Sequence, residues 1–286
     1  MENWYIYSLV ALLLMGTQRF LYKVSAEKKY NTAQTTFSFM ATVTIISAIL
    51  FIRLNQSVND IGMLIGIAFL NSASFAIGTM THIEALKHIP ATLAYPIIRL
   101  NAVIVVLFSI VYFKDRISGY QIIGILIAMA VIVILTRETG DQGRSSKNIQ
   151  RGLILIFIAL FAGAVAAVSS KFAAMHTNKL AFMALSYSLG ATFSFGLRKK
   201  MAVPEAVSSA GGAWTLGFVM GLFNFGGFYS FLKALTNGPL SIIASIMGMH
   251  FVVSIILSAV IYKEKITPTR ITGILLTLLS IIFLRL

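Results

Sequence analysis

Arg99 is the residue whose type and position most clearly suggest chemistry, because it interrupts the long apolar segment 92–113. An arginine is costly inside a lipid bilayer, and its planar guanidinium can bind a carboxylate or a phosphate. Tyr95 lies one helical turn earlier, and Pro96 predicts a kink in the same helix. We interpret Arg99 as an anion-binding residue. An ion pair with Glu84, or extension of the side chain to the membrane surface, is the alternative.

Polar residues in other apolar segments are further candidates for binding a small-molecule substrate. They are Gln18, Asn71, Asn101, Asn224, Tyr229 and His250. The alternative role of all of them is hydrogen bonding between helices, which also places amides and hydroxyls inside a membrane. Arg19 has Lys23 four residues later, and we expect Arg19 to extend to the membrane surface rather than into a cavity.

Acidic residues are scarce. The chain has nine, and Glu84 is the one that can reach a membrane-spanning segment. Proton coupling would therefore involve Glu84, His82 or His250. Basic side chains without matching acids predict a cavity of positive potential, which favours ligands that carry an anionic group. No cofactor and no metal site are predicted, and the absence of cysteine excludes disulfides and thiolate metal sites.

The composition is that of an integral membrane protein. Hydrophobic residues make up 58% of the 286 residues and charged residues 11%, whereas a soluble domain carries roughly 25% charged residues. The net charge of +14 could suggest a nucleic-acid partner. The basic residues lie instead in short gaps between apolar segments, so the expected partner is the lipid bilayer and not a nucleic acid.

Ten apolar segments are long enough to cross a membrane, since a helix of about 20 residues spans the hydrocarbon core. We predict an all-α fold with spans at 4–22, 33–53, 61–83, 92–113, 119–136, 152–174, 180–197, 212–232, 240–262 and 268–285. The first segment lacks the basic leader of a signal peptide, so we expect it to be retained as a span.

The chain contains an internal repeat. Residues 84–136 align without a gap on residues 233–285, at an offset of 149 positions. We predict a first repeat of five spans at 1–136, a polar linker at 137–151 and a second repeat of five spans at 152–286. Two repeats with an odd number of spans must have opposite orientations in the membrane, which is the arrangement of inverted-repeat transporters.

Each half also shares two short motifs. An alanine-leucine-x₃-proline motif opens the fourth segment at 85–90 and at 234–239, and a basic-acidic-basic turn closes it at 114–116 and at 263–265. With five segments per half, the chain resembles the drug/metabolite transporter superfamily, EamA type. The resemblance implies a central cavity lined by the first, third, fourth, sixth, eighth and ninth segments, open alternately to each side.

The function expected from these observations is secondary transport of a small anionic or zwitterionic metabolite by alternating access. The alternatives are a translocator of lipid-linked substrates and a non-transporting membrane scaffold. An intramembrane enzyme is disfavoured, because the sequence lacks H-E-x-x-H and G-x-S-x-G. The pairs Gly62/Gly66 and Gly217/Gly221 predict close packing of helices within the chain, with a homodimer as the alternative.

We expect a multi-pass protein of a prokaryotic plasma (inner) membrane. Its orientation has two conflicting indications. Lysine and arginine are twice as frequent in the predicted loops on the side away from the termini as on the terminal side, which places both termini outside. The resemblance to the EamA type implies termini inside.

Overall fold

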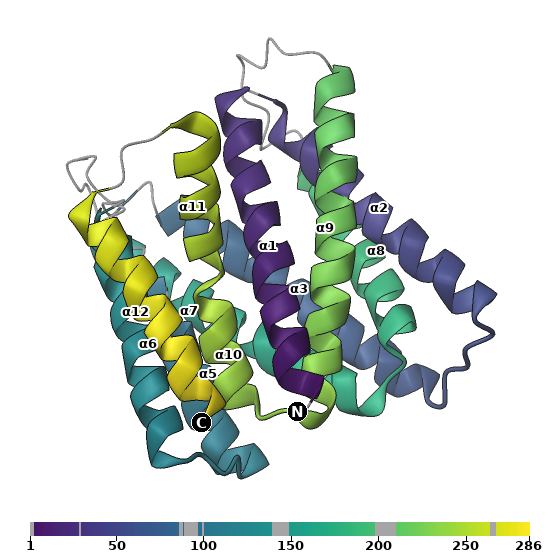
Figure 1. The fold of residues 1–286 in the computed structure, drawn as a ribbon. Coiled ribbons are helices and arrows are strands. Elements are labelled where there is room, and N and C mark those ends of the chain that lie inside the picture. Colours follow the sequence, from purple (N-terminus) through teal and green to yellow (C-terminus); the bar gives the residue numbers. More distant parts are fainter. Residues whose placement is uncertain are drawn as a thin grey trace.

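The structure, a computed structural model, describes residues 3–28, 30–85, 88, 97–98, 100–138, 149–197, 210–263 and 267–286. All regular secondary structure in this part of the chain is helical (Figure 1). The helices are α1 (Asn3–Glu27), α2 (Thr32–Arg53), α3 (Ile61–Ala85), α5 (Asn101–Phe108), α6 (Gly119–Glu138), α7 (Ile149–His176), α8 (Lys179–Leu197), α9 (Ala210–Asn237), α10 (Leu240–Gly248), α11 (His250–Tyr262) and α12 (Pro268–Arg285), with a π-helical turn η1 (Ser109–Phe113) after α5.

Six stretches of the described chain are long and apolar enough to cross a membrane, and each coincides with one of the ten predicted spans. They are Ala33–Arg53, Ile61–His82, Gln150–His176, Gly211–Asn237, Leu240–Tyr262 and Pro268–Arg285. Asn101–Phe113 and Gly119–Ile134 are shorter apolar helices. Large apolar side chains also remain exposed along the bundle, such as Val111 at 79% and Ile52 at 71%. In a bilayer these side chains face lipid, so the chain is built as a multi-pass membrane protein.

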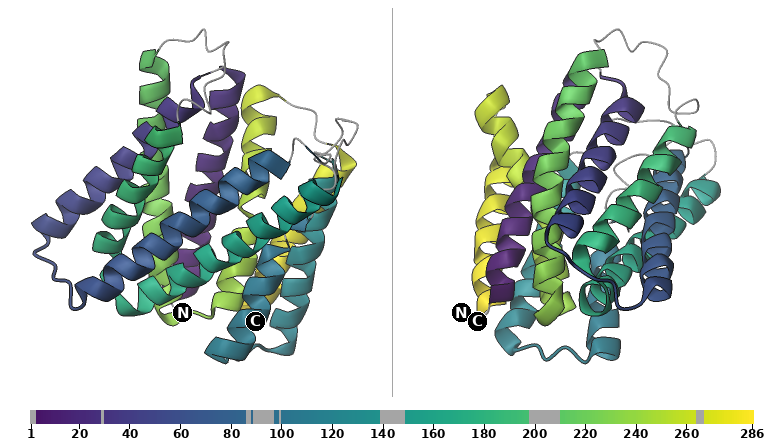
Figure 2. Two further views of the ribbon diagram at one scale, coloured as in Figure 1. Left: turned by 180° about the vertical axis from the view of Figure 1, so that it is seen from behind. Right: turned by 90° about the vertical axis from the view of Figure 1, so that its right-hand side faces the viewer.

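Corresponding helices of the two halves run in opposite directions. Both chain termini lie at one end of the bundle, which we call the terminal end; the opposite end is the far end (Figures 1 and 2). Helix α1 begins at the terminal end, whereas its counterpart α7 ends there. Trp4, near the start of α1, lines the same cavity as Lys171 and Met175 near the end of α7. Helix α3 likewise begins at the terminal end and its counterpart α9 ends there. The two repeats are therefore inverted.

Inversion produces two matching interfaces, α1 against α9 and α3 against α7. Each has a glycine at the same position of the repeat, 149 residues apart. A Cβ added to Gly227 of α9 would lie 2.7 Å from Met15 Cγ of α1. A Cβ added to Gly78 of α3 would lie 3.5 Å from Ala162 Cβ of α7. Both glycines face the partner helix, and the α1–α9 interface is the tighter of the two.

The two G-x-x-x-G pairs have different surroundings. A Cβ on Gly221 would lie 2.5 Å from Thr42 Cβ of α2, and one on Gly217 would meet the same helix at 2.6 Å. The prediction of internal packing is confirmed for this pair. It is wrong for Gly62 and Gly66: a Cβ on Gly66 would meet nothing within 4 Å, and one on Gly62 would meet a single side-chain oxygen at 3.4 Å. This part of α3 lies on the outer surface.

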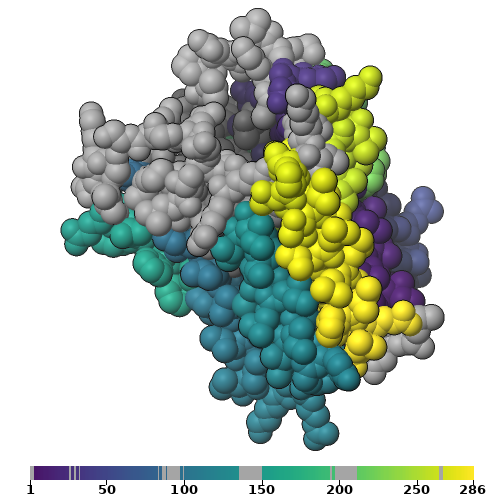
Figure 3. Space-filling view, turned by 60° about the vertical axis from the view of Figure 1, so that its left-hand side comes forward, coloured from purple at the N-terminus to yellow at the C-terminus, as the bar shows by residue number. Residues whose placement is uncertain are grey.

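Helices α6 and α12, the last of each repeat, lie side by side along one face of the molecule (Figure 3). Ser280 of α12 donates a hydrogen bond to the carbonyl of Gly124 on α6 at 2.8 Å. The remaining helices surround an interior in which Phe182, Met220 and Leu232 are fully buried. This arrangement leaves the ends of α7 and α9, the start of α10 and the η1–α6 turn together at the terminal end.

Candidate functional site

The apolar stretch Leu240–Tyr262 is interrupted near its middle. Helix α10 ends at Gly248 and α11 begins at His250, and the intervening Met249 donates its backbone N–H to the carbonyl of Ile246 at 3.0 Å. The chain thus makes one tight turn before the second half-helix starts. The span predicted at 240–262 is confirmed as an apolar stretch, and the structure adds a break at Met249 that the sequence did not predict.

The first repeat has the same interruption at the matching position. Leu100 donates its backbone N–H to the carbonyl of Ile97 at 3.0 Å, and α5 begins at Asn101. Leu100 and Ile97 precede Met249 and Ile246 by 149 residues. Asn101 and His250 therefore each occupy the first position of a second half-helix. Half-helix ends of this kind form the substrate and ion sites of many transporters.

A proline is not needed for the interruption. Sequence analysis attributes a kink in segment 92–113 to Pro96, which lies outside the described residues together with Tyr95 and Arg99. In the second repeat the position of Pro96 is occupied by Ser245, yet the helix is interrupted there as well. Within α10, the Ser245 hydroxyl donates a hydrogen bond to the carbonyl of Ser241 at 2.8 Å.

Both half-helix starts pack against α1 or α7 through a glycine. The Asn101 amide nitrogen lies 2.8 Å from where a Cβ on Gly163 of α7 would be. The carbonyl of His250 lies 2.6 Å from the corresponding point on Gly16 of α1. The His250 Nδ1 also contacts the carbonyl of Met247. Each interruption is thus held close to the first helix of one repeat.

Asn71 belongs to a hydrogen-bond network that joins three helices. Its amide nitrogen lies 2.8 Å from the carbonyl of Ala166, 2.9 Å from Ser169 Oγ and 3.1 Å from Ser170 Oγ, all on α7. Its amide oxygen accepts a hydrogen bond from Ser186 Oγ of α8 at 3.1 Å. Both ends of this amide are therefore used within the protein.

Gln18 and Asn224 form a second buried pair, across the α1–α9 interface. Each is 4% exposed, and the Asn224 amide donates to Gln18 Oε1 at 2.9 Å. Gln18 Nε2 reaches the hydroxyl of Tyr22 at 3.3 Å. Asn224 Oδ1 is buried and has no hydrogen-bond partner among the described residues. Exchanging the oxygen and nitrogen of this amide would leave the donor unused instead, so one atom remains available in either assignment.

The other predicted candidates make contacts of their own. Tyr229 stacks on Phe225 of the same helix, and the ammonium of Lys233 lies 5.7 Å from the centre of the Tyr229 ring. Glu84 lies 3.6 Å from the imidazole of His88. His82 and Glu84 both lie in the last turn of α3, at the far end. The structure therefore brings Gln18 and Asn224 together, whereas His82 and Glu84 lie on α3, which is not part of this pair.

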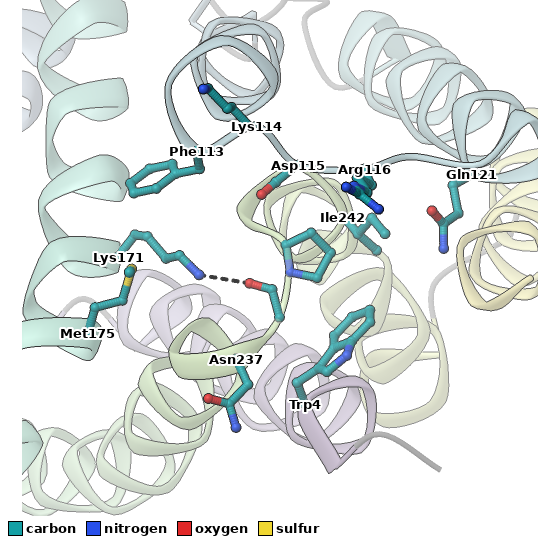
Figure 4. A pocket seen from close by; sticks show the side chains of 12 residues that line it. Trp4, Phe113, Lys114, Asp115, Arg116, Gln121, Lys171, Met175, Asn237 and Ile242 are labelled. Atoms are coloured by element: carbon teal, nitrogen blue, oxygen red, sulfur yellow. Dashed lines mark hydrogen bonds between the residues drawn. The ribbon is translucent and has the colours of Figure 1, made fainter.

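A cavity of about 500 Å³ opens at the terminal end (Figure 4). Its walls come from both repeats: the η1–α6 turn of the first, and the ends of α7 and α9 with the start of α10 from the second. Its polar lining consists of Lys114, Asp115, Arg116, Gln121, Lys171 and Asn237. The chain link between α9 and α10, at Gly238 and Pro239, crosses this cavity.

Lys171 holds the end of α9 from across the cavity. This lysine is 6% exposed, and its ammonium donates to the carbonyls of Leu235 at 2.6 Å and Gly238 at 2.9 Å. It also lies 5.7 Å from the centre of the Phe113 ring. The last carbonyls of a helix have no partner within the helix and carry partial negative charge, so a cation is favourable at this point.

Asp115 holds the start of α10 from the other half of the protein. Its Oδ2 accepts hydrogen bonds from the backbone N–H of Ser241 at 3.0 Å and from the Ser241 hydroxyl at 2.7 Å. The Ser109 hydroxyl contacts the same oxygen. A carboxylate is favourable at the positive start of a helix. We call Asp115, Ser241 and Lys171 the terminal clamp, because together they fix both sides of the α9–α10 link.

The far end repeats two of these features. Lys23 matches Lys171 in the repeat, and its ammonium lies 5.4 Å from the centre of the Tyr262 ring, which matches Phe113. Lys114 and Lys263, which begin the two basic-acidic-basic turns, both have left-handed backbones with φ of 55° and 52°. Glu264, the counterpart of Asp115, lies outside the described residues.

Sequence analysis did not assign a role to Asp115 or Lys171. Their signal was nevertheless present, because the acidic residue of the turn and the lysine at the end of the first helix recur in both repeats. What the sequence could not show is the partner of each, since both contacts join elements that are far apart in the chain.

A protein-family model shows which family the chain belongs to. The model of the EamA-like transporter family matches residues 2–137 and again residues 150–286. The chain belongs to the EamA-like transporter family. It is therefore a membrane transporter of the drug/metabolite type, and the two matches correspond to its two inverted repeats.

A solved structure supports the same fold. A crystal structure described only as that of a protein has a TM-score of 0.77 and 15% sequence identity, with 99% of this chain and 96% of that chain covered. A structure of the sodium–calcium exchanger NCX_Mj, soaked with zero Na⁺ and Ca²⁺, is 19% identical over 98% of this chain and 96% of its own. Its TM-score of 0.16 carries no argument about this EamA-like transporter. No curated protein sequence matches the chain.

Proposed function

We propose that this EamA-like transporter carries a small metabolite with an anionic group across the membrane by alternating access. The observation that carries the proposal is the pair of matching helix interruptions, at Leu100 and Met249. They place Asn101 and His250 at the starts of two half-helices that belong to inverted repeats. A site between inverted half-helices can be exposed to either side by a rocking motion of one repeat against the other.

The terminal clamp supports a cycle with discrete states. Its hydrogen bonds join the two repeats, with Asp115 contributed by the first and Ser241 by the second. Breaking these bonds would free the α9–α10 link and widen the cavity at the terminal end. The recurrence of Lys23 beside Tyr262 gives the far end comparable elements, so each end can be held closed in turn.

The preference for an anionic group rests on the distribution of charge. Arg19 and Lys23 lie within α1, and Lys171 lies within α7. Acidic residues are absent from the described helices α2 and α7 to α12, and α1 has one only at its last residue, Glu27. A substrate path between these helices would therefore have positive potential in a medium of low dielectric constant, where charges are weakly screened.

Uptake by reconstituted protein tests this function. Proteoliposomes preloaded with an unlabelled compound are mixed with the same compound in ¹⁴C-labelled form, using L-lactate, L-glutamate, glycerol 3-phosphate and choline in separate assays. We expect accumulation of at least one of the three anions. Asn101→Ala and His250→Ala should lower it at least tenfold, because both residues flank the site.

Leu126→Ala is the matched control, since Leu126 is 60% exposed on α6 and faces lipid. It should transport at the wild-type rate. Accumulation of choline alone would contradict the anionic preference. Full transport by both Asn101→Ala and His250→Ala would contradict the location of the site.

A further inference from the structure

The α1–α9 interface contains a group of polar residues that the helix interruptions do not account for. Gln18 and Asn224 form a buried pair, Gln18 reaches the Tyr22 hydroxyl, and Asn224 keeps one buried amide atom without a partner among the described residues. A buried polar atom without a partner costs free energy, and such atoms are rare in folded proteins. A ligand that supplies the missing hydrogen bond would remove this cost.

Arg19 adds a charge to the same group. Its guanidinium carbon lies 5.7 Å from the centre of the Tyr22 ring. It is also close enough to the hydroxyls of Tyr22 and Tyr187 to interact electrostatically with both. Tyr187 comes from α8, so the group includes residues of α1, α8 and α9.

Arg19 has no carboxylate partner in the described part of the chain. It lies eight residues before the end of α1 at Glu27, about 12 Å along the helix. Its side chain is nevertheless exposed, whereas Gln18 and Phe20 on either side are buried. An unpaired guanidinium inside a membrane protein is costly unless an anion or water reaches it. The contrast with Lys171 is informative, because that buried cation already has two carbonyl acceptors.

We infer that Arg19, Tyr22, Tyr187 and Asn224 form the subsite that binds the anionic group of the substrate. The inference rests on the proposed transport function and names the residues that recognise its ligand. The guanidinium presents two parallel N–H donors that match a carboxylate or a phosphate, and the two tyrosine hydroxyls add donors. The unused amide atom of Asn224 bonds a hydroxyl beside the anionic group, accepting if it is the oxygen and donating if it is the nitrogen. The ligand class is thus a small carboxylate or phosphate ester with a neighbouring hydroxyl.

Thermal unfolding of the purified full chain with defined probes tests the subsite, because a ligand that binds the folded state raises its Tm. The probes are acetate, L-lactate, inorganic phosphate, glycerol 3-phosphate and choline. We expect an anionic probe to raise the Tm of the wild type. The compound with an added hydroxyl should bind more tightly, L-lactate over acetate if the group is a carboxylate and glycerol 3-phosphate over inorganic phosphate if it is a phosphate.

Substitutions then locate the binding. Arg19→Gln should weaken the probe at least a hundredfold, and Arg19→Lys at least tenfold, since lysine keeps the charge but not the paired donors. Tyr187→Phe, which removes one hydroxyl and keeps the ring, should weaken it severalfold. Arg53→Gln is the matched control, because Arg53 is exposed at the last residue of α2, and it should bind as the wild type does.

The outcomes separate the subsite from the transport function. Wild-type affinity in Arg19→Gln, with an anionic probe still bound and transported, would overturn the subsite and leave the transport function standing. A response of the wild type to choline alone, or to none of the anions, would overturn both the subsite and the anionic substrate. The folding of Arg19→Gln is checked by its Tm without probe, and Tyr187→Phe tests the same subsite if that variant does not fold.

Discussion

The α1–α9 and α3–α7 interfaces are copies of one structural element, yet they differ in two respects. Gly227 leaves no room for a side chain against α1, whereas a Cβ on Gly78 would make ordinary van der Waals contact with α7. Asn71 of α3 uses both ends of its amide within the protein. Asn224 of α9 keeps one amide atom unused and lies with Arg19, Tyr22 and Tyr187.

This difference shows how one repeat can serve two purposes. A fully satisfied polar network fixes the relative position of its helices, because every alternative arrangement loses hydrogen bonds. A network with one unsatisfied atom beside an unpaired cation is incomplete without a ligand. Under the proposed subsite, the α3–α7 interface has a structural role and the α1–α9 interface a binding role.

The largest difference in the free energy of unfolding is expected between substitutions at the matched glycines Gly227 and Gly78. Gly227→Ala forces a methyl group to 2.7 Å from Met15 Cγ and 3.2 Å from the Met15 backbone nitrogen, and should lower the free energy of unfolding by about 2 kcal/mol. Gly78→Ala, at the matching position, should change it by less than about 0.5 kcal/mol. Unfolding in a titration with dodecyl sulfate measures both. Equal losses in the two variants would mean that the interfaces are equally tight.

Replacing the two asparagines sharpens the comparison. Asn224→Ala should lower the affinity for the transported anion about tenfold, because it removes a hydrogen bond to a group beside the charge. Asn71→Ala should leave that affinity unchanged and lower the free energy of unfolding by about 1 kcal/mol, as expected for interhelical hydrogen bonds in membranes. Probe titration and unfolding are measured on the same preparations. An affinity loss in Asn71→Ala as large as that in Asn224→Ala would remove the distinction.

A smaller effect is expected at the terminal clamp. Asp115→Asn removes the charge that favours the start of α10 while keeping the size of the side chain. The natural chain has no cysteine, so a single cysteine at Ile242 reports on this end. Ile242 is 1% exposed and lines the cavity. Its labelling by a membrane-impermeant maleimide should become about fivefold faster with Asp115→Asn. Gln121→Ala, at the rim of the same cavity, should leave the rate unchanged.

Much of the fold could be predicted from the apolar segments and the internal repeat of the sequence. The apolar segments, the gap-free repeat and the two turns predicted the helices and their inversion. The amides Gln18, Asn71 and Asn224 could be identified because polar atoms are rare in such segments. Their different roles could not, because they depend on which hydroxyls and carbonyls the partner helix presents.

The interruption at Met249 was missed for a different reason. It has no proline, and α10 and α11 together form one long apolar stretch in which His250 was interpreted as a binding residue and not as the start of a second helix. Its counterpart at Leu100 shows that the turn is a property of the repeat. Asp115 and Lys171 were missed because their partners, Ser241 and Gly238, lie in other elements of the fold.

Alternating exposure of the two ends is the claim on which the account rests, and one pair of labelling rates tests it directly. Ile242→Cys reports on the terminal end, and Ser258→Cys reports on the far end, where Ser258 is 5% exposed and matches Ser109 of the clamp region. Each is measured with and without Asp115→Asn in sealed vesicles, with reagent supplied from either side. We predict that the substitution accelerates labelling at Ile242 and slows it at Ser258. Rates that rise together at both ends, or that do not respond at either end, would contradict the account.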